Sequence, residues 1–267
     1  MKKWISNLMA KLFGKKTAPA PSPTPVPPPV TTPTPTPVPP PVVIAPVEPK
    51  LPTFAEAFSN LDRWIVSTWE APAGGKFSRN NVSIVDGILC LRLQQTIVNG
   101  VVQSVGGEVS TREKFGYGTY EFEVKASSTA AAPTAVGNPV SGTITGCFNY
   151  APSSITEIDM EVEGGTRSNL AQFTSWMLAS NPNQSIKVPT VPAPHVEFKK
   201  YKFVWTPQGT TFYINGVEAC RHTKVIPSEP APFLFNHWGT NSVDWGGVAT
   251  PDVERYMWVK NFSFTPL

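Results

Sequence analysis

The segment TEIDMEVEGG at residues 156–165 decides the fold class of this chain. Its apolar residues Ile158, Met160 and Val162 alternate with acids, which is the pattern of a β-strand with one buried face. The acids occupy the other face, and they are Glu157, Asp159, Glu161 and Glu163. Like charges on one face repel each other, so folding gives no reason for this pattern. It indicates a chemical function.

Strand patterns separated by turn signals recur through the rest of the chain. Asp86-Gly87 and Asn99-Gly100 are strong hairpin turns between apolar runs, and Asn215-Gly216 is a third. Further strand-like runs are GYGTYEFEVKAS (116–127), KKYKFVWTPQGTTFYINGVEACRHT (199–223) and VERYMWVKNFSFTPL (253–267). No long segment has helical periodicity. The expected class is therefore all-β, a sandwich or a barrel.

The composition divides the chain into three parts. Residues 17–52 contain 16 of the 30 prolines, which favours an extended, disordered linker rather than a core. A peptide ligand for a proline-binding domain is an alternative use of this segment. Residues 53–267 are long enough for one large β-domain. Residues 1–16 form a short segment of their own.

The charge is also divided. Residues 1–52 carry six lysines and one glutamate, a charge of +5, whereas the whole chain carries +3, so residues 53–267 carry −2. This mildly acidic domain gives no reason to expect nucleic-acid binding. In residues 1–16 one helical face is apolar and five lysines supply positive charge. We expect this segment to dock on a membrane surface or a protein partner, with a degenerate export signal as the alternative.

The three cysteines, Cys90, Cys147 and Cys220, each lie in an apolar strand-like run. We expect buried free thiols, because their number is odd and their spacing fits no metal site. His195, His222 and His237 are too scattered to form a metal centre, and we expect the His237 side chain to point away from Trp238. No cofactor and no metal are expected.

The acid segment resembles glycoside hydrolase family 16, and within it the bacterial lichenases, which are endo-β-1,3-1,4-glucanases. EIDME at 157–161 fits the family signature E-[I/L/V]-D-x-E. The likeness runs in order through almost all of residues 53–267. Other matching stretches are STWEAPAGGKFSRNNVSI (67–84), FGYGTYEFEVK (115–125), FVWTPQGTTFYINGV (203–217), NHWGTNSVDWGG (236–247) and RYMWVKNFSF (255–264). The resemblance implies a jelly-roll sandwich of two curved antiparallel sheets, with substrate across the concave one.

Carried over by position, the resemblance implies that Glu157 is the nucleophile and Glu161 the general acid/base. Asp159 between them would orient and tune the pair. The implied reaction is double displacement with retention. Residues four apart on a strand have Cα atoms ~13 Å apart, so the carboxyl groups must lean toward each other. The signature has no extra residue before Glu161, which in this family favours β-1,3-1,4-glucan over pure β-1,3-glucan.

The resemblance also implies six residues that contact the sugar. They are Trp238, Asn236, Glu108, Gln172, Trp176 and Trp245. Core packing is the alternative for each tryptophan, and we assign Trp205 and Trp258 to the core. The chain departs from lichenases at Ile155 and Ser110, where they have Trp and Arg; Arg112 lies two residues further on the same face. Met257 replaces the family's calcium-binding Asp. Glu163, where relatives are usually apolar, is expected to be exposed at the strand end. The alternative is that it perturbs the catalytic pair, in which case Glu163→Leu would shift the pH–rate profile.

These observations favour a monomeric endo-β-glucanase that acts on a polysaccharide outside the cell or in an envelope. The alternatives are a transglycosylase on a related β-glucan and a non-catalytic glycan-binding protein of a cell or virion surface. A binding protein would have no need of three catalytic acids. The expected location is extracellular or at the cell surface or envelope, with a virion surface as an alternative, and the chain shows no clear signal peptide.

Overall fold

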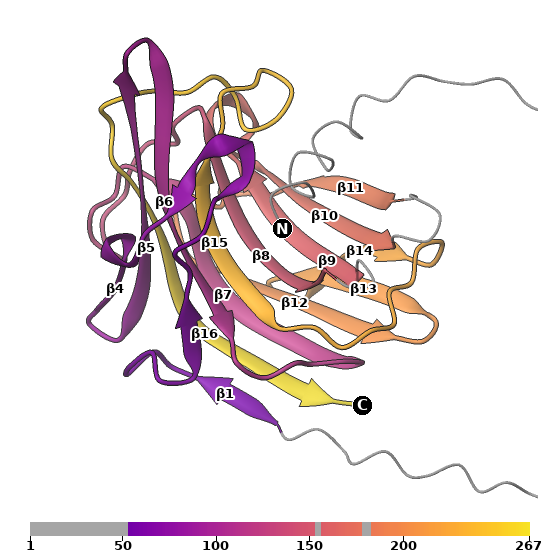
Figure 1. Cartoon of the computed structure of the whole chain (residues 1–267). Coiled ribbons are helices and arrows are strands. Elements are labelled where there is room, and N and C mark those ends of the chain that lie inside the picture. The colour runs from indigo at the N-terminus through magenta and orange to yellow at the C-terminus, as the bar shows by residue number, and fades with distance from the viewer. Residues whose placement is uncertain (1–52, 153–155, 178–182) are drawn as a thin grey trace, which may run out of the picture.

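The computed structural model describes residues 53–152, 156–177 and 183–267. The predicted segments 1–16 and 17–52 and residue Ile155 lie outside the described residues, so the predictions made for them stay predictions. Nearly all regular structure in the described part is β-strand (Figure 1). No helix within these ranges is long and apolar enough to span a bilayer.

Sixteen strands and three short 3-10 helices make up the described part. The strands are β1 (Phe54–Glu56), β2 (Trp64–Val66), β3 (Lys76–Phe77), β4 (Val82–Val85), β5 (Ile88–Val98), β6 (Val101–Thr111), β7 (Gly118–Ser128), β8 (Thr143–Ala151), β9 (Thr156–Glu163), β10 (Leu170–Met177), β11 (Asn183–Pro189), β12 (Lys199–Thr206), β13 (Gly209–Ile214), β14 (Val217–His222), β15 (Phe233–Gly239) and β16 (Arg255–Pro266). The 3-10 helices are η1 (Pro72–Gly74), η2 (Arg79–Asn81) and η3 (Gly165–Arg167).

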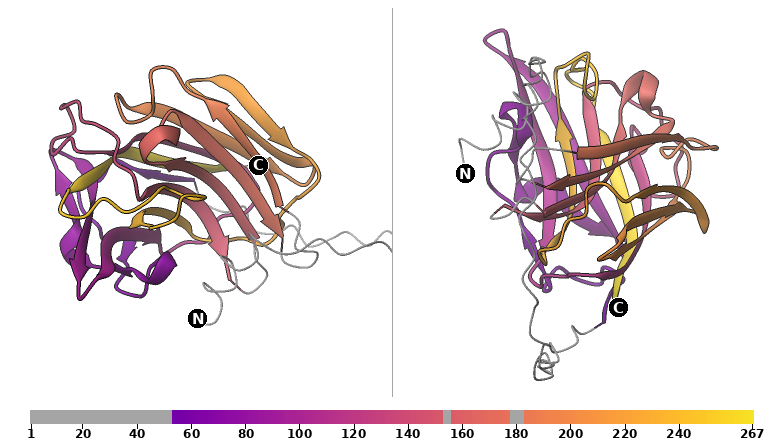
Figure 2. Two further views of the ribbon diagram at one scale, coloured as in Figure 1. Left: turned by 90° about the horizontal axis from the view of Figure 1, so that it is seen from above. Right: turned by 90° about the vertical axis from the view of Figure 1, so that its right-hand side faces the viewer.

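The strands form two curved layers that face each other (Figures 1 and 2). One layer has the order β11-β10-β9-β8-β15-β6, and the edge strand β2 pairs with β6; we call this layer the acid sheet. The other has the order β5-β16-β7-β12-β13-β14, with β4 on β5 and β1 on β16. The β5–β6 hairpin connects them. The all-β sandwich expected from the sequence is confirmed.

Local sequence explains the turns that connect neighbouring strands. Asn99 and Gly100 both have positive φ (52° and 77°) at the β5–β6 turn, as do Asp86 and Gly87 (52° and 74°) between β4 and β5. Two-residue turns of this kind match the twist of antiparallel strands. The predicted hairpins are therefore confirmed.

The core between the two layers is unusually aromatic. Phe233 and Phe262 stack with ring centroids 4.2 Å apart, and Tyr120 stacks on Phe203 at 4.3 Å. Trp205 and Trp258 are buried, as predicted, and their indole N–H groups donate to the carbonyl oxygens of Pro227 and Ala130. This core supports the acid sheet from behind, because stacked and edge-on rings each add attraction beyond their buried area.

The buried side chains of the sandwich include His237 and two cysteines. His237 is fully buried, and its ring nitrogens lie 2.7 Å from the Leu91 carbonyl oxygen and 2.9 Å from Ser127 Oγ. It thus points away from Trp238, as expected. All three cysteines are free thiols; Cys90 and Cys147 are buried, whereas Cys220 is only half-buried.

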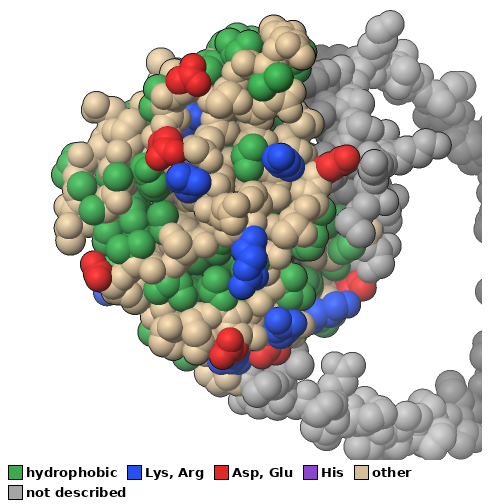
Figure 3. Space-filling model, turned by 60° about the vertical axis from the view of Figure 1, so that its left-hand side comes forward, with side chains coloured by type: hydrophobic (Ala, Val, Ile, Leu, Met, Phe, Trp, Pro, Cys, Tyr) green, Lys and Arg blue, Asp and Glu red, His purple; other side chains and the backbone are tan. Residues whose placement is uncertain are grey.

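The surface carries its charges in a mixed pattern. Figure 3 shows the left-hand side of the molecule in Figure 1, where Lys and Arg side chains lie between Asp and Glu side chains and apolar areas. Ion pairs such as Arg63–Glu113 and Arg92–Glu254, each 3.2 Å apart, account for part of this mixing. Exposed pairs of this kind stabilise a fold only weakly.

Candidate active site

Strand β9 lies inside the acid sheet, between β8 and β10. Its pairing is continuous with both neighbours. Residues Thr156 to Glu163 of β9 pair with β8, and Thr156 to Val162 pair with β10. Ile158, Met160 and Val162 point into the core, so Glu157 and the other acids lie on the opposite face. We call this face of the sheet the acid face. The regular ladder confirms that the signature contains no bulge.

Strand register brings four of the predicted site residues into one row across the acid face. Gln172 on β10 is opposite Glu161, Glu161 is opposite Gly146 on β8, Gly146 is opposite Asn236 on β15, and Asn236 is opposite Glu108 on β6. Neighbouring strands lie about 4.8 Å apart. A row of five strands therefore presents polar groups over a length that suits several linked sugar units.

Gly146 lies in the middle of this row, against the Asn236 amide. A Cβ atom on Gly146 would lie 2.3 Å from Asn236 Oδ1, which is closer than real contacts allow. The Asn236 amide thus lies against the backbone between itself and Glu161. This Oδ1 atom is buried and accepts no hydrogen bond from the part of the chain that the structure describes. It is available to a hydroxyl group of a ligand.

Glu157, Asp159 and Trp176 form a connected group beside this row. Trp176 lies opposite Glu157 on β10, and its indole nitrogen donates to Asp159 Oδ2 at 3.1 Å. The carboxyl groups of Asp159 and Glu157 share a hydrogen bond. Glu157 Oε2 is buried and has no hydrogen-bond partner among the described residues. One oxygen of this carboxylate is therefore buried and not hydrogen-bonded within the described part of the chain.

Burial and mutual repulsion shift the titration of all three acids. Burial raises the pKa of Glu157 to about 8, and the hydrogen bond with Asp159 opposes this rise. Burial, then the charges of Glu157 and Glu161, raise the pKa of Asp159 well above its usual range. The pKa of Glu161 is raised to about 8 by burial and by the charges of Glu157 and Glu163, against the effect of Lys187. At neutral pH Glu157, Asp159 and Glu161 together thus keep protons that exposed acids would lose.

Glu108 and Asn236 form a second polar group at the β6 end of the row. Glu108 is buried, accepts a hydrogen bond from Ser67 Oγ at 2.6 Å and accepts another from Asn236 Nδ2 at 3.2 Å. Burial raises the pKa of Glu108 to about 7, while hydrogen bonds with Ser67, Asn236 and Trp69 oppose the rise. Trp69 is 44% exposed, so an aromatic surface lies open beside this acid.

The three predicted stacking tryptophans have different surroundings. Trp238 is only 6% exposed and packs with Ala71, Phe77 and Ile144. Most of its side-chain surface is therefore used in core packing, which was the alternative to sugar stacking. Trp245 is half-buried against the same cluster, and Lys187 Nζ lies 5.6 Å from its ring centroid. Trp176 is half-buried and bonded to Asp159. Stacking of any of them on sugar stays a prediction.

Glu163 does not lie where the sequence suggested. We expected it to be exposed at the strand end, but it is 4% exposed and bound by two cations and a backbone amide. The strand-end position explains the expectation, because ends usually face water. The error arose because segments distant in sequence, including Lys187 and the loop after β15, cover this end.

Sequence reasoning also missed residues next to the acids. Tyr150 on β8 lies opposite Glu157, and Phe148 lies opposite Asp159. Burial and the charge of Glu157 raise the pKa of Tyr150, so its phenol stays neutral. The alternation in CFNYA (147–151) carried this signal, since Phe148 and Tyr150 share a face with Gly146. Trp69 had no such signal, because it lies outside the strands.

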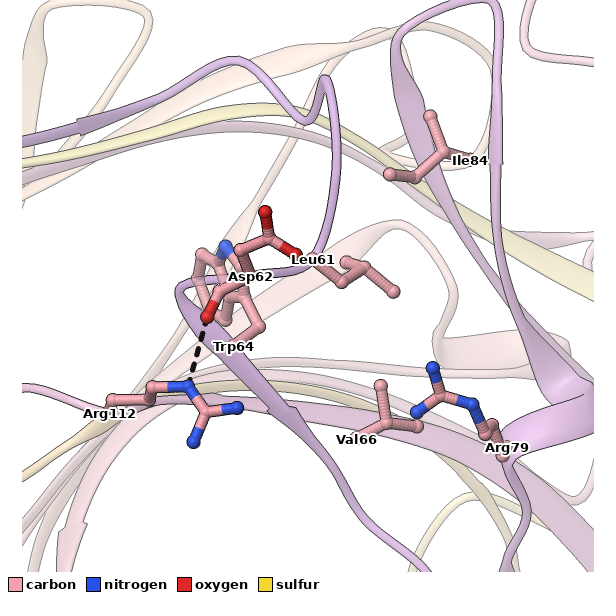
Figure 4. A pocket seen from close by; sticks show the side chains of 7 residues that line it. All are labelled: Leu61, Asp62, Trp64, Val66, Arg79, Ile84 and Arg112. Carbon is pink, nitrogen blue, oxygen red and sulfur yellow. Dashed lines mark hydrogen bonds between the residues drawn. The ribbon is translucent and has the colours of Figure 1, made fainter.

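One cavity has no acid of β9 in its lining. It has a volume of about 500 Å³ and is lined by Leu61, Asp62, Trp64, Val66, Arg79, Ile84 and Arg112 (Figure 4). Arg112 Nε donates to the Asp62 carbonyl oxygen at 3.0 Å. Arg112 follows directly after the end of β6 at Thr111, and the expectation that it shares a face with Ser110 stays a prediction.

Metal binding has no support in the described ranges, which contain no group of three or more His, Cys, Asp and Glu residues placed to hold an ion. Met257, at the position of the relatives' calcium ligand, is buried in the core. The chemistry available on the acid face is that of paired carboxyl groups, one able to attack and one able to give a proton.

Comparisons with known proteins agree with this geometry. The family model for glycosyl hydrolases family 16 matches residues 72–252. The endo-1,3-1,4-beta-glycanase ExoK of Rhizobium meliloti (strain 1021) is 30% identical over 222 residues, which are 80% of this chain and 78% of that protein. A beta-glucanase of Acetivibrio thermocellus is 28% identical over 224 residues, 78% of this chain and 62% of that protein.

A solved structure shows the same fold. A prokaryotic beta-1,3-1,4-glucanase (lichenase) derived from a mouse hindgut metagenome superposes with a TM-score of 0.70 at 23% identity. The match covers 81% of this chain and all of that one. The matched part includes both layers of the sandwich, because it is far longer than either.

Proposed function

The chain belongs to glycosyl hydrolases family 16, and from this premise we propose how its acid face cleaves a glycan. It is an endo-acting glycoside hydrolase of β-glucan. The observation that carries the proposed mechanism is the row of Glu157, Asp159 and Glu161 on one unbroken face of β9. Retaining glycosidases need two carboxyl groups on either side of one bond, and this strand supplies them with a third between.

The proposed substrate is a mixed-linkage β-1,3-1,4-glucan. Two observations support it. The relative from Rhizobium meliloti and the metagenomic lichenase carry this specificity in their names. The regular register of β9 also lacks the extra residue before the second glutamate that the sequence pattern associates with other substrates of the family.

Glu157 is the nucleophile in this proposal. Asp159 donates a hydrogen bond to it, which favours a negative charge on Glu157 over one on Asp159. Its Oε2 atom has no partner within the described part of the chain, so attack on the anomeric carbon breaks no hydrogen bond. Trp176 fixes Asp159 from the other side through its indole nitrogen.

Glu161 is the general acid and base. The negative charges of Glu157 and Glu163 raise its pKa, so once Glu157 is ionised Glu161 holds its proton more strongly. Its proton passes to the glycosidic oxygen as Glu157 bonds to the anomeric carbon and the leaving sugar departs. Glu161 then takes a proton from water, whose oxygen attacks the same carbon and releases Glu157. Two inversions retain the anomeric configuration.

The proposed sugar contacts lie on both sides of the acids. Asn236 and Glu108 bind hydroxyl groups at one end of the row, and Gln172 binds at the other. Trp176 and Trp245 supply aromatic surface, and Trp238 contributes its exposed edge. Tyr150, Phe148 and Trp69 join this set, because they lie beside Glu157, Asp159 and Glu108. Aromatic faces suit the apolar faces of pyranose rings.

The test is to follow product release and stereochemistry with the full chain on barley β-glucan, laminarin and xyloglucan. We expect reducing ends from barley β-glucan, with β-anomers formed first in an NMR time course. Glu157→Ala should lose this activity and regain part of it with azide, which would yield an α-glycosyl azide. Glu161→Ala with azide should yield the β-azide instead. Inverted products, or the opposite pair of azides, would contradict the assignment.

A further inference from the structure

The buried acid Glu163 has contacts that the proposed reaction does not use. Its Oε1 atom lies 2.8 Å from Lys187 Nζ on β11. Its Oε2 atom lies 2.7 Å from Arg167 Nη2 of η3 and accepts a hydrogen bond from the Gly246 backbone N–H at 2.7 Å. One carboxylate therefore joins the end of β9 to three separate segments. Buried carboxylates with this many donors are strongly held.

The Gly246 contact belongs to the loop that carries Trp245. This loop, residues 240–254, connects β15 to β16 and lies at the top of Figure 1, near the end of β9. Arg167 Nη2 also donates to the Val243 carbonyl oxygen at 3.1 Å, and Lys187 Nζ lies over the Trp245 ring. Every partner of Glu163 thus either belongs to the loop or contacts it.

The loop has other supports. The Gly246 carbonyl oxygen accepts from Gly142 N at 2.8 Å and from Thr143 N at 3.2 Å, which ties the loop backbone to the start of β8. Gln95 Oε1 accepts from Thr250 N at 3.3 Å, and the Thr240 hydroxyl donates to the Trp245 carbonyl oxygen at 3.0 Å. Only the Glu163 group, as far as the described residues show, joins the Trp245 part of the loop to the strand that carries Glu157 and Glu161.

We propose that Glu163 is a positioning residue that fixes Trp245 relative to Glu157 and Glu161. It thereby determines how well the enzyme binds the part of the glycan beyond the cleaved bond. This inference rests on the proposed function, because it assigns Trp245 to a sugar subsite. Glu163 touches neither substrate nor the reacting atoms. It acts through the Gly246 amide, Arg167 and Lys187.

The same group changes the charge that Glu161 experiences. On β9 itself Glu161 interacts electrostatically with Glu157, Asp159 and Glu163. Lys187 of β11 and the core-facing thiol of Cys147 on β8 also interact with its charge. Negative Glu163 favours the protonated form of Glu161, whereas positive Lys187 favours the ionised form. Removing one or the other charge should therefore move the basic limb of the pH–rate profile in opposite directions.

The experiment compares three variants of the full chain, Glu163→Gln, Lys187→Met and the double variant, with Glu218→Gln as the matched control. Glu218 is an exposed acid paired with Arg221 on β14, away from the acid row. We would measure kcat and KM on barley β-glucan across pH. We would also measure the rate of chymotrypsin cleavage after Trp245, which reports on loop attachment without needing catalysis.

For Glu163→Gln we expect KM to rise about tenfold with a smaller change in kcat, as expected for the loss of one charged contact. The basic limb should move about 0.5 pH unit lower, and that of Lys187→Met should move higher. The double variant should return the limb close to wild type. Cleavage after Trp245 should be faster in Glu163→Gln than in the control. Glu163→Gln in a Trp245→Ala background should leave KM unchanged.

Wild-type kinetics, an unmoved pH limb and control-like cleavage in Glu163→Gln would overturn the inference while leaving the proposed function intact. If Glu163→Gln does not fold, the basic limb of the pH–rate profile of Lys187→Met is the test. A move to higher pH would support the inference, and an unmoved limb would overturn it. A wild-type chain without glucanase activity would instead overturn the proposed function. In that case the cleavage rate still reports whether Glu163 holds the loop.

Discussion

The two faces of β9 are chemically opposite and differ in their enclosure. Ile158 and Met160 on one face are 0% and 1% exposed, whereas on the other face Asp159 is 4% exposed and Glu157 and Glu161 are half-buried. The apolar face packs against the aromatic core, where burial removes hydrocarbon from water and stabilises the fold. The acid face holds carboxyl groups that burial and repulsion penalise. The apolar face of β9 thus stabilises the fold, and the carboxyl groups on the other face destabilise it in part.

The comparison indicates how the molecule holds reactive groups in place. The backbone that carries the acids is fixed by packing on the reverse face, and side-chain contacts such as that of Trp176 with Asp159 orient the carboxyl groups. Substitutions on the acid face should therefore change activity far more than stability. Substitutions on the core face should do the opposite.

The largest expected effect is on activity and comes from Glu157→Gln. We expect kcat to fall by roughly 10⁴-fold or more, because the variant lacks the attacking carboxylate. The melting temperature should stay close to that of the wild type at pH 7 and exceed it above pH 8, where the wild-type Glu157 becomes ionised. Steady-state kinetics and calorimetry check the two halves. A large loss of stability alongside the loss of activity would show that the two faces are not separable.

Phe262→Ala should produce the reverse pattern. Phe262 stacks on Phe233 in the core, and its removal leaves a cavity. We expect the free energy of unfolding to fall by about 3–5 kcal/mol, measured in urea, with kcat of the folded fraction within about twofold of wild type. A collapse of kcat at temperatures where the variant is folded would contradict the separation.

Glu108 on the acid face should make the free energy of unfolding depend on pH. Its pKa is raised from 4.5 to about 7 in the folded chain, so the folded state binds a proton that the unfolded state has lost. Its contribution to stability is complete below pH 4.5 and is lost as the pH rises through 7. We expect the free energy of unfolding to fall by up to about 3 kcal/mol over this window.

Glu108→Gln should flatten this dependence, because glutamine does not titrate. Glu218→Gln is the control, since Glu218 is exposed and paired with Arg221. Urea titrations at pH 5, 6, 7 and 8 provide the measurement. An unchanged slope in Glu108→Gln would mean that this carboxyl group does not carry the effect.

The smallest of these effects should come from Asp159. Asp159→Ala removes both the donor to Glu157 and the acceptor of the Trp176 N–H. We expect kcat/KM to fall about 50-fold, the equivalent of one hydrogen bond to a charged group. Asp159→Asn keeps a donor for Glu157 and should lose less. If the two variants are equally impaired, the charge of Asp159 matters rather than its hydrogen bond.

Some of the fold and site could be predicted because the signals are local. Alternation along β9 placed Glu157, Asp159 and Glu161 on one face, and Asn99-Gly100 marked the β5–β6 turn. Both depend on backbone geometry within a few residues, which the chain carries wherever it folds. The likeness to a known family then supplied the architecture and the roles of the acids.

Other features needed the register between strands from distant parts of the chain. Gln172, Glu161, Asn236 and Glu108 share a row only because β10, β9, β8, β15 and β6 pair as they do. The burial of Glu163 and the packing of Trp238 against Ala71 and Phe77 have the same origin. No local pattern encodes such contacts.

By itself, the sequence determined the all-β class, the hairpins and the face on which the three acids lie. These follow from side-chain alternation and turn preference, which act between near neighbours. Only the tertiary structure decided which groups surround those acids: the hydrogen bond from Trp176 to Asp159, the free oxygen of Glu157 and the cations around Glu163. The reason is physical, because the charge and burial that set a pKa depend on what lies within a few ångströms in space, whatever its distance along the chain.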